Sequence, residues 1–436
     1  MGSHRVTERF RRGRARRSVA VLGAVLLAVS ACGGDDDGDD AGDDAGDEES
    51  SGSETSADLL GPENAASGEP VRIGMVSDGA TQAFDNTDEL RAAQAAAEYW
   101  NAHQGGVGGR PVEVVTCETG ADPAGATDCA NQLVEQEVVA VTLSQSAVTE
   151  SLWEPLRAAG VPTFWLQGSG AVAADEQSSF LMYNPDLTLF GLPMSVAESE
   201  DADKLAFVVI DVPQALEGLE GDVDAITEAA GLEYEVVAIP PGTADMTSQM
   251  REVADGGADV VQVIGNDAFC IAAFNGLNAV AYEGEVTTIT QCITDATREG
   301  VPGDVLEGTY VTSAITLGAT DDPTFQLYEA VIDEYGEDVQ DVNNATSMGG
   351  YVAMSSLLTS LAEIPEDITP DTVIDTIRSM PEADLPGGGG MTFQCGGSAD
   401  AELPAVCTNQ SLRTRLDAEG NPTEYEVVDS SDIMPE

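Results

Sequence analysis

The sequence predicts an α/β protein built from two doubly wound, Rossmann-like lobes. Short apolar runs that suit buried strands alternate with helical stretches, and this alternation is typical of parallel sheets. It occurs twice in succession, from Val71 and again from Leu205, as two series of comparable size. A chain of 436 residues that is 42% hydrophobic can bury a core in each of two lobes.

The first series predicts four strands that alternate with three helices. Asp122-Pro123 marks a helix start because Pro fits the first helical turn, and Gln104-Gly105-Gly106 marks a helix stop. We expect strands at 71–77, 112–116, 138–143 and 162–166, and helices at 89–103, 124–136 and 149–159.

The second series repeats the pattern without a long Pro- or Ser-rich linker before it. The two lobes are therefore expected to be joined by short connections and to share segments. We expect strands at 205–211, 234–239, 260–265 and 286–290, and helices at 219–230, 247–256 and 269–279.

The N-terminus has the pattern of an export signal, and we assign residues 1–31 to a signal peptide. Seven Arg lie at or before Arg17, and residues 19–31 form an uncharged, mostly apolar run that is too short to span a membrane. The small residues before Cys32 resemble a bacterial lipobox, which predicts cleavage before Cys32 and a lipid on its thiol. An ordinary signal peptide followed by a chance Cys is the alternative.

The chain is strongly acidic, with 17 Lys and Arg against 78 Asp and Glu and a net charge of −61. Residues 32–70 are predicted to be the lipidated Cys and a disordered tether, because fourteen acids lie there among Gly, Ala and Ser. The remainder, 71–436, still carries a net charge near −53. This charge excludes nucleic acid as a partner, and it suggests adaptation to high salt, which screens repulsion.

Six cysteines remain after Cys32, an even number in an exported chain, and this favours disulfides. Six cysteines allow fifteen pairings, and their order along the chain suggests a local scheme. Zinc is disfavoured because the spacings provide no paired C-x-x-C knuckles, and we expect neither a metal nor another cofactor. The expected pairs are Cys117–Cys129, Cys270–Cys292 and Cys395–Cys407.

An enzyme is disfavoured because the chain is poor in histidine, which acid–base and triad chemistry usually recruits. Its two histidines are His4 and His103, and only His103 follows the predicted signal. Gly168-Ser169-Gly170 lacks the G-x-S-x-G spacing of a nucleophile elbow. We expect no catalytic residues.

An ordered set of segments resembles the solute-binding proteins of ABC importers, of the branched-chain amino acid type with the class I periplasmic-binding-protein fold. The segments are IGMVS, AAEYWNAHQGGVGGRPVEVV, CETGADPAGATDCANQLV, AVTLSQSAVT, AAGVPTFWLQGSG and PPGTADMTSQMREVADGGADVVQVIG. The resemblance spans 71–436. It implies a monomeric lipoprotein on the outer face of the cell membrane, whose lobes close over a small-molecule solute and deliver it to permease subunits.

The resemblance also implies that the chain crosses between the lobes three times. We place the crossings near Asp186-Leu187, near Ala314-Ile315 and near Gly387–Gly390, although the tetraglycine can equally be a surface loop. Lobe one then comprises 71–187 and 315–388, and lobe two comprises 188–314 and 389–436.

Doubly wound sheets bind ligands at the carboxyl ends of their strands, and the resemblance assigns candidate roles there. In lobe one, hydroxyls and backbone N–H groups would hold a solute carboxylate, unless these are ordinary loop and cap residues. Phe84 would cover the solute, or it belongs to the core. The lobe-one candidates are Phe84, Ser144, Gln145, Ser146, Gln167, Gly168 and Ser169.

In lobe two the candidates are Asp211, Asn266, Asp267 and Gln291. The resembled amino acid binders have a Tyr in the 211–216 loop and an acid near 291, and this chain has neither. Asp211 or Asp267 can neutralise an amine or can merely cap a helix. We expect a small polar solute, an amino acid or an amide-bearing relative. A lipoprotein that presents its solute to a signalling partner is the alternative function.

We predict that Cys32→Ser releases the protein from the membrane, because the variant has no thiol to carry the lipid. Fractionation of cells into membrane and soluble parts, followed by immunoblotting, measures the change. A correctly processed variant that stays in the membrane fraction contradicts the prediction.

Overall fold

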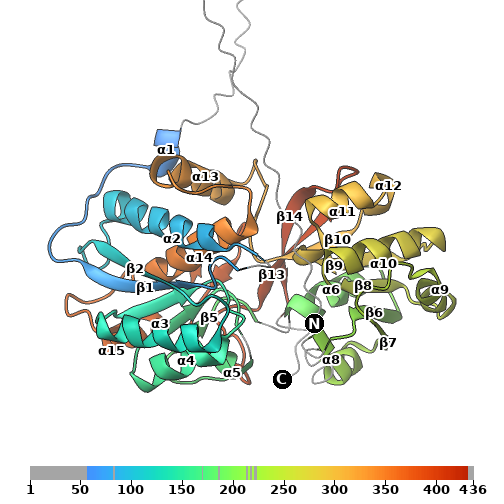
Figure 1. The fold of residues 1–436 in the computed structure, drawn as a ribbon, viewed down its shortest axis with the longest axis horizontal. Helices are drawn as coiled ribbons and strands as arrows, with labels where there is room; N and C mark the ends of the chain where they lie inside the picture. The colour runs from blue at the N-terminus through green and yellow to red at the C-terminus, as the bar shows by residue number, and fades with distance from the viewer. Residues whose placement is uncertain are drawn as a thin grey trace, which may run out of the picture. The chain divides into compact units, whose positions relative to one another are not determined.

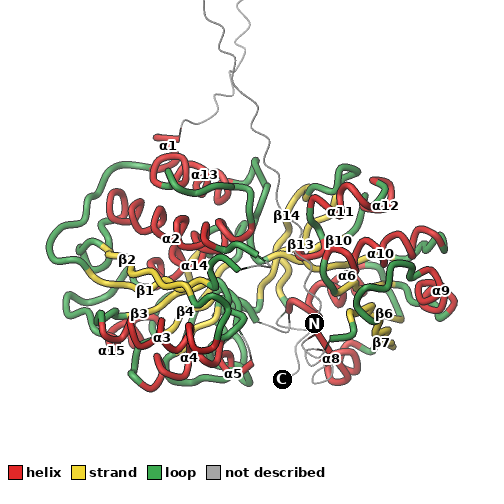
Figure 2. Tube along the Cα trace, in the orientation of Figure 1, coloured by secondary structure: helices red, strands yellow, loops and turns green. Residues whose placement is uncertain are grey.

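The structure is a computed structural model that describes residues 56–81, 84–168, 170–184, 187–212, 215–216, 219 and 223–430. Figure 1 shows its elements, and Figure 2 separates helices, strands and loops by colour. The predicted signal peptide, Cys32 and the first part of the predicted tether lie outside the described residues. Among those that are described, no helix has the length and apolar character that crossing a membrane requires.

Lobe one is built on a five-stranded parallel sheet with the order β2-β1-β3-β4-β5. The order places the first strand inside the sheet, as a doubly wound fold requires. A two-stranded antiparallel hairpin, β11-β12, accompanies the sheet. The strands are β1 (Val71–Ser77), β2 (Val112–Glu118), β3 (Ala140–Leu143), β4 (Thr163–Trp165), β5 (Ser179–Leu181), β11 (Ala383–Asp384) and β12 (Thr392–Phe393).

Helices cover both faces of this sheet, with α2 and α14 on one side and α3 and α4 on the other (Figure 1). Alternate residues of a strand serve the two cores, so Met75 packs with α2 and α14 while Val76 packs with α3 and α4. The helices are α1 (Ser56–Leu60), α2 (Thr87–Tyr99), η1 (Trp100–Gln104), α3 (Pro123–Glu135), α4 (Thr149–Ala158), α5 (Gly170–Ala173), α13 (Pro323–Tyr335), α14 (Ala345–Ser360) and α15 (Pro370–Arg378).

Two helix boundaries in lobe one form as predicted. The Asp122 carboxylate accepts hydrogen bonds from the N–H groups of Ala124 and Gly125, and Pro123 occupies the first turn. At the other predicted boundary, Gly105 adopts a left-handed conformation with φ of 78° and ends η1. Local side-chain and backbone chemistry was sufficient to predict both.

Lobe two is built on a seven-stranded sheet with the order β14-β13-β10-β9-β8-β6-β7. The five strands from β10 to β7 are parallel, and β13 and β14 are antiparallel additions at one edge. Every residue of β8 is buried, which requires packing on both faces. The strands are β6 (Lys204–Ile210), β7 (Glu233–Ile239), β8 (Val260–Ile264), β9 (Glu285–Ile289), β10 (Tyr310–Ser313), β13 (Gln410–Leu416) and β14 (Pro422–Asp429).

The helices of lobe two share one apolar core with this sheet, in which Phe190, Phe207 and Phe274 are fully buried. The helices are η2 (Leu187–Gly191), α6 (Leu192–Ser199), α8 (Val223–Ala230), α9 (Thr247–Asp255), α10 (Asp267–Ala279), η3 (Thr290–Cys292), α11 (Asp295–Gly300) and α12 (Gly303–Leu306).

The chain passes between the two lobes at three places, and side chains of the first place are hydrogen-bonded to the other two. The first passage runs between β5 and η2, and the second follows β10, since Val311 belongs to the lobe-two core and Ile315 to the lobe-one core. The Tyr183 hydroxyl on the first passage donates to the Ser313 carbonyl on the second, at 2.6 Å. Burial raises the pKa of Tyr183 well above its usual value, so this hydroxyl keeps its proton.

The third passage lies later in the chain than we predicted. Gly387–Gly390 forms the loop of the β11-β12 hairpin, and Met391 and Phe393 beyond it are still buried in the core of lobe one. The apolar side chains after the tetraglycine keep that segment on lobe one, and the chain enters lobe two only at β13. The Asn184 side chain donates to the Asn409 side chain at 3.0 Å and thereby joins the first passage to the third.

The end of the predicted tether also differs from the expectation. Residues 56–60 form α1, and Leu60 is buried in the lobe-one core. The N–H groups of Asn64 and Ala66 donate to the carbonyls of Ala102 and Asn101. The acidic composition of residues 32–70 gave no indication of these contacts, because one buried Leu and a few backbone hydrogen bonds do not change the composition of a segment.

The three predicted disulfides are present, as Cys117–Cys129, Cys270–Cys292 and Cys395–Cys407. Cys270 lies in the first turn of α10 and Cys292 ends η3, and both are fully buried. This bridge therefore ties together the two segments that follow β8 and β9.

We predict that the double substitution Cys270→Ala/Cys292→Ala lowers the free energy of unfolding by about 3 kcal/mol, since it restores loop freedom to the unfolded chain. Guanidinium denaturation of the oxidised proteins measures the change. A reductant added to the wild type and to the variant is the control, because it should weaken the variant less. Equal unfolding midpoints for the oxidised variant and wild type contradict the prediction.

Candidate solute-binding site

The carboxyl ends of β1, β3 and β4 bring most of the lobe-one candidates to one edge of the sheet. The sheet order places β3 between β1 and β4, so the segments that follow these strands are neighbours. The N–H of Gln167 donates to the carbonyl of Ser144 at 2.7 Å, which fixes the segment after β4 to the segment after β3. Gly168 follows, where a Cβ would lie 2.9 Å from a methyl group of Leu181, and Ser169 lies outside the described residues.

A buried carboxylate, Asp78, is the centre of this edge. Only 4% of Asp78 is exposed. Its Oδ1 accepts hydrogen bonds from the hydroxyls of Thr119 at 2.7 Å and Ser146 at 2.9 Å. Its Oδ2 accepts from the N–H of Ala147 at 2.7 Å. One side chain after β1 thus holds the segments that follow β2 and β3.

This arrangement changes the role that we predicted for Ser146. Its hydroxyl donates to Asp78 and accepts a hydrogen bond from the N–H of Val148 at 3.1 Å, just before α4 begins. The Ser146 hydroxyl, which was expected to help hold a solute carboxylate, therefore already serves a carboxylate of the protein. The alternative that Ser146 organises the loop and the helix start describes its contacts in the structure.

A second buried carboxyl group, Glu89 on α2, lies beneath the same loops. Glu89 is 2% exposed, and its side chain accepts a hydrogen bond from the N–H of Ser144 at 2.8 Å. Burial raises the pKa of Glu89 to about 7, and the nearby Asp78 carboxylate adds to the effect, against the opposing hydrogen bonds from Ser144. Glu89 can therefore change its charge near neutral pH while it holds a loop of the site.

Two glycines of α14 make room for this arrangement. A Cβ on Gly350 would lie 2.1 Å from the Glu89 carbonyl oxygen, and one on Gly349 would lie 2.9 Å from the Ser144 hydroxyl oxygen. The close approach of α14 to α2 thus requires glycine at this point of the contact. It also encloses the Glu89 carboxyl group.

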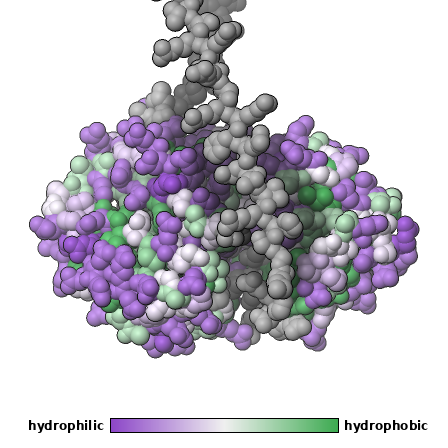
Figure 3. All heavy atoms as spheres, viewed as in Figure 1, coloured by the Kyte–Doolittle hydropathy of each residue, from purple (hydrophilic) through white to green (hydrophobic). Residues whose placement is uncertain are grey.

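Phe84 and Gln145 are exposed beside this edge. Phe84 is 40% exposed, so it is not part of the core, and it is one of three large apolar side chains exposed among the described residues. Its loop is closed by a bridge between Ala80 and Asp85 and by hydrogen bonds between Thr81 and Phe84. Polar side chains dominate the face shown in Figure 3, which makes an exposed aromatic residue the more unusual.

In lobe two, the four candidates also lie at carboxyl ends of parallel strands. Asp211 follows β6 and is exposed, and Gln291 lies in η3 after β9 and is exposed. Asn266 after β8 caps α10, since its side-chain oxygen accepts from the N–H of Phe269. The Asp267 carboxylate accepts from the N–H of Ala268. Asn266 therefore has the capping role that we had considered for its neighbour.

Our sequence reasoning overlooked Asp78 and Glu89 as members of the site. For Glu89 the sequence contained an indication, because its spacing from Ala92, Ala93 and Ala96 places it on the apolar face of a helix. All four residues are buried in the structure. For Asp78 the sequence offers only its position after a strand. Its three donors come from distant parts of the chain, and only the folded sheet brings them together.

Residues 70–409 match the periplasmic binding protein family, and the chain belongs to this family. The family consists of solute-binding proteins rather than enzymes, in agreement with the sequence analysis. The sequence matches no curated protein. Membership also agrees with the predicted fold and with an extracytoplasmic location.

Several solved structures share this fold at low sequence identity. An ABC transporter substrate-binding protein from Sphaerobacter thermophilus has a TM-score of 0.63 and 16% identity, over 83% of this chain and 99% of that one. The branched-chain amino acid transporter substrate-binding protein of Streptococcus pneumoniae, in complex with isoleucine, has a TM-score of 0.61 and 16% identity over 83% and 99%. A solute-binding protein of R. palustris with 4-hydroxybenzoate has a TM-score of 0.60 and 17% identity over 82% and 97%.

We predict that Glu89→Gln makes the protein more stable than the wild type at high pH. The folded-state pKa of about 7 exceeds the ordinary value of 4.5, so the wild type loses stability as pH rises from about 4.5 through about 7. The variant does not titrate there, and above pH 7 it should be the more stable by roughly 3 kcal/mol.

Denaturant titrations of both proteins between pH 4.5 and 8.5 measure this difference. Glu98→Gln on the exposed side of the same helix is the matched control, and its difference from the wild type should change little with pH. A Glu89→Gln effect that is the same at every pH contradicts the prediction.

Proposed function

We propose that the protein is an extracytoplasmic lipoprotein that captures a small polar solute between its two lobes and delivers it to the permease of an ABC importer. The solute carries an amine or an amide, and the protein acts as a monomer. The lipid on Cys32 holds the protein at the outer face of the cell membrane.

The observation that carries the proposal is the gathering of polar residues at the carboxyl ends of two parallel sheets. Asp78 and Gln167 lie at this edge in lobe one, and Asp211, Asn266 and Gln291 lie at the corresponding edge in lobe two. In doubly wound folds this edge is where ligands bind. Two such edges in one chain, joined by three passages, suit a solute that both lobes contact.

The passages between the lobes support a hinge. The Tyr183 and Asn184 side chains link the first passage to the second and the third, so the three segments are positioned together. A solute that contacts both lobes would favour a closed arrangement by its differential affinity for that arrangement.

The relatives support transport and leave the solute open. Two of the similar structures hold isoleucine and 4-hydroxybenzoate, which are chemically unlike, so the shared fold does not select one solute. The position of Cys32 after small residues and an apolar run supports the lipid anchor.

A thermal-shift screen of amino acids, amides, amines, sugars and phosphates tests the proposal. A true solute should raise the melting temperature in proportion to the logarithm of its concentration once binding saturates. A screen in which only phosphates or sulfates stabilise the protein, or in which no solute does, contradicts the proposed function.

We predict that Phe84→Ala weakens binding of the solute found by the screen about fivefold to tenfold, because the exposed ring is positioned to cover it. Calorimetric titration measures the affinity. Val236→Ala on β7 is the matched control, since Val236 is also 40% exposed and lies on the edge strand of lobe two. Equal affinities for the Phe84→Ala and Val236→Ala variants contradict the role of Phe84.

A further inference from the structure

We infer that Asp78 determines the charge of the solute, and that the protein binds a small organic cation rather than a carboxylate. The inference rests on the proposed function, because it names the chemical class that the same site accepts. Its basis is the occupation of the Ser146 hydroxyl and the Ala147 N–H by the protein's own carboxylate, together with the absence of Lys, Arg and His from the segments that follow the parallel strands.

The Asp78 carboxylate occupies the place at the start of α4 where a solute anion would be held. Ala147 N–H and the Ser146 hydroxyl donate to it, and Val148 N–H donates to Ser146. A solute carboxylate at Ser146 would find these donors engaged and would lie within a few ångströms of Asp78. Two carboxylates at such a distance repel each other strongly in a partly buried site.

The segments that follow the parallel strands offer no positive charge to offset this negative charge. In the sequence, the segments between each parallel strand and the next helix contain no Lys, Arg or His, and they contain eight Asp or Glu. Asp211 after β6 is one of the exposed acids on the lobe-two side. An anionic solute would need a cationic partner, which these segments do not supply.

An exposed aromatic ring completes a site that suits a cation. Phe84 is in the same loop as Asp78, and the hydrogen bond from Asn86 N–H to the Gly79 carbonyl closes that loop at 3.1 Å. The face of an aromatic ring attracts ammonium and quaternary ammonium groups. Acidic side chains and an accessible aromatic ring therefore both favour a cationic solute.

Matched pairs of probes that differ in a carboxylate test the inference. We choose cadaverine against lysine and choline against glycine betaine, and we measure their affinities by calorimetry and thermal shift. In at least one pair the cation should bind wild-type protein about tenfold or more tightly than its carboxylate-bearing counterpart. Its affinity should fall as salt is added.

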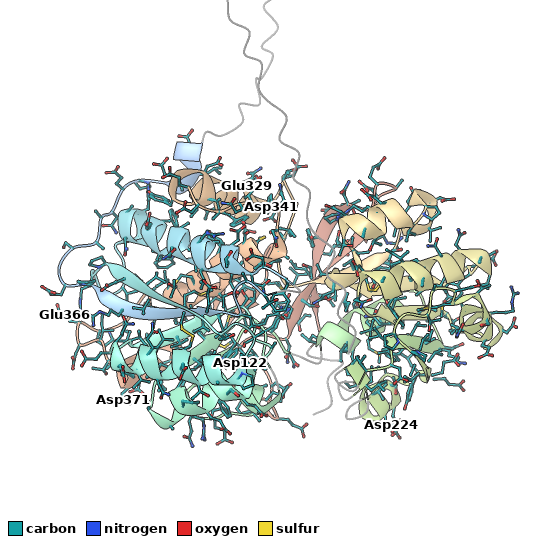
Figure 4. All side chains as sticks on the ribbon, in the orientation of Figure 1. Asp122, Asp224, Glu329, Asp341, Glu366 and Asp371 are labelled. Carbon is teal, nitrogen blue, oxygen red and sulfur yellow. A yellow bond between two sulfur atoms is a disulfide. The ribbon has the colours of Figure 1, made fainter. Side chains whose placement is uncertain are left out.

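Asp78→Asn is the critical variant, because the amide keeps the size of the side chain while removing its charge. It should reduce the preference for the cation about tenfold. Asp371→Asn is the matched control, since it removes the same charge from an exposed position on α15 (Figure 4) and should leave the preference unchanged. Circular dichroism and the melting curve of each variant without solute verify that it folds.

Several results would overturn the inference. They are tighter binding of the carboxylate members by wild-type protein, an equal effect of Asp78→Asn and Asp371→Asn, or a broad screen whose stabilising solutes are all anionic or neutral. In each of these cases the proposed solute-binding function would stand, unless the stabilising solutes were only phosphates or sulfates. A protein that no solute stabilises would contradict both the inference and the proposed function. If Asp78→Asn does not fold, the salt dependence of cation binding by the wild type decides, and affinity that does not fall with salt refutes the inference.

Discussion

The carboxylate of Asp78 is the interaction on which the lobe-one site depends. It accepts hydrogen bonds from Thr119, Ser146 and Ala147, which lie in two different segments after β2 and β3. A buried carboxylate is stable only when such donors compensate for the loss of water, so the segments and the carboxylate require each other. The Asp78 carboxylate therefore determines both the geometry of the lobe-one sheet edge and its buried negative charge.

Buried polar groups are also hydrogen-bonded to one another where the lobes are joined. Tyr183 and Asn184 are almost completely buried, and each bonds to a segment that belongs to a different passage. Breaking these hydrogen bonds would leave buried polar groups unpaired and would lower the stability of the folded protein. The contacts therefore hold the three passages together. The parallel strands of the two sheets belong to different apolar cores.

At the candidate site, a disulfide links segments of lobe two, and buried acids link segments of lobe one. In lobe two, Cys270–Cys292 connects the segments that carry Asn266 and Gln291, so their spacing does not depend on polar contacts. In lobe one, Glu89 and Asp78 hold the corresponding segments by hydrogen bonds, which respond to pH and to substitution. Acidic residues therefore lie both on the surface of the protein and, buried, at the lobe-one site.

The sequence by itself determined the alternation of strands and helices in the two predicted series, the helix boundary at Asp122 and the class of binding fold, and it favoured the disulfide pairs that the structure contains. These follow from local periodicity, from capping chemistry and from an ordered set of motifs, all of which are written in short stretches of chain. It did not determine where the chain returns to lobe two, because Met391 and Phe393 are buried by partners far away in sequence. Nor did it reveal that Ser146 serves Asp78, since those two residues are 68 positions apart and meet only when β1 and β3 pair. Only the tertiary structure decided these contacts, because hydrogen-bond partners and burial depend on which strands become neighbours in the folded sheet.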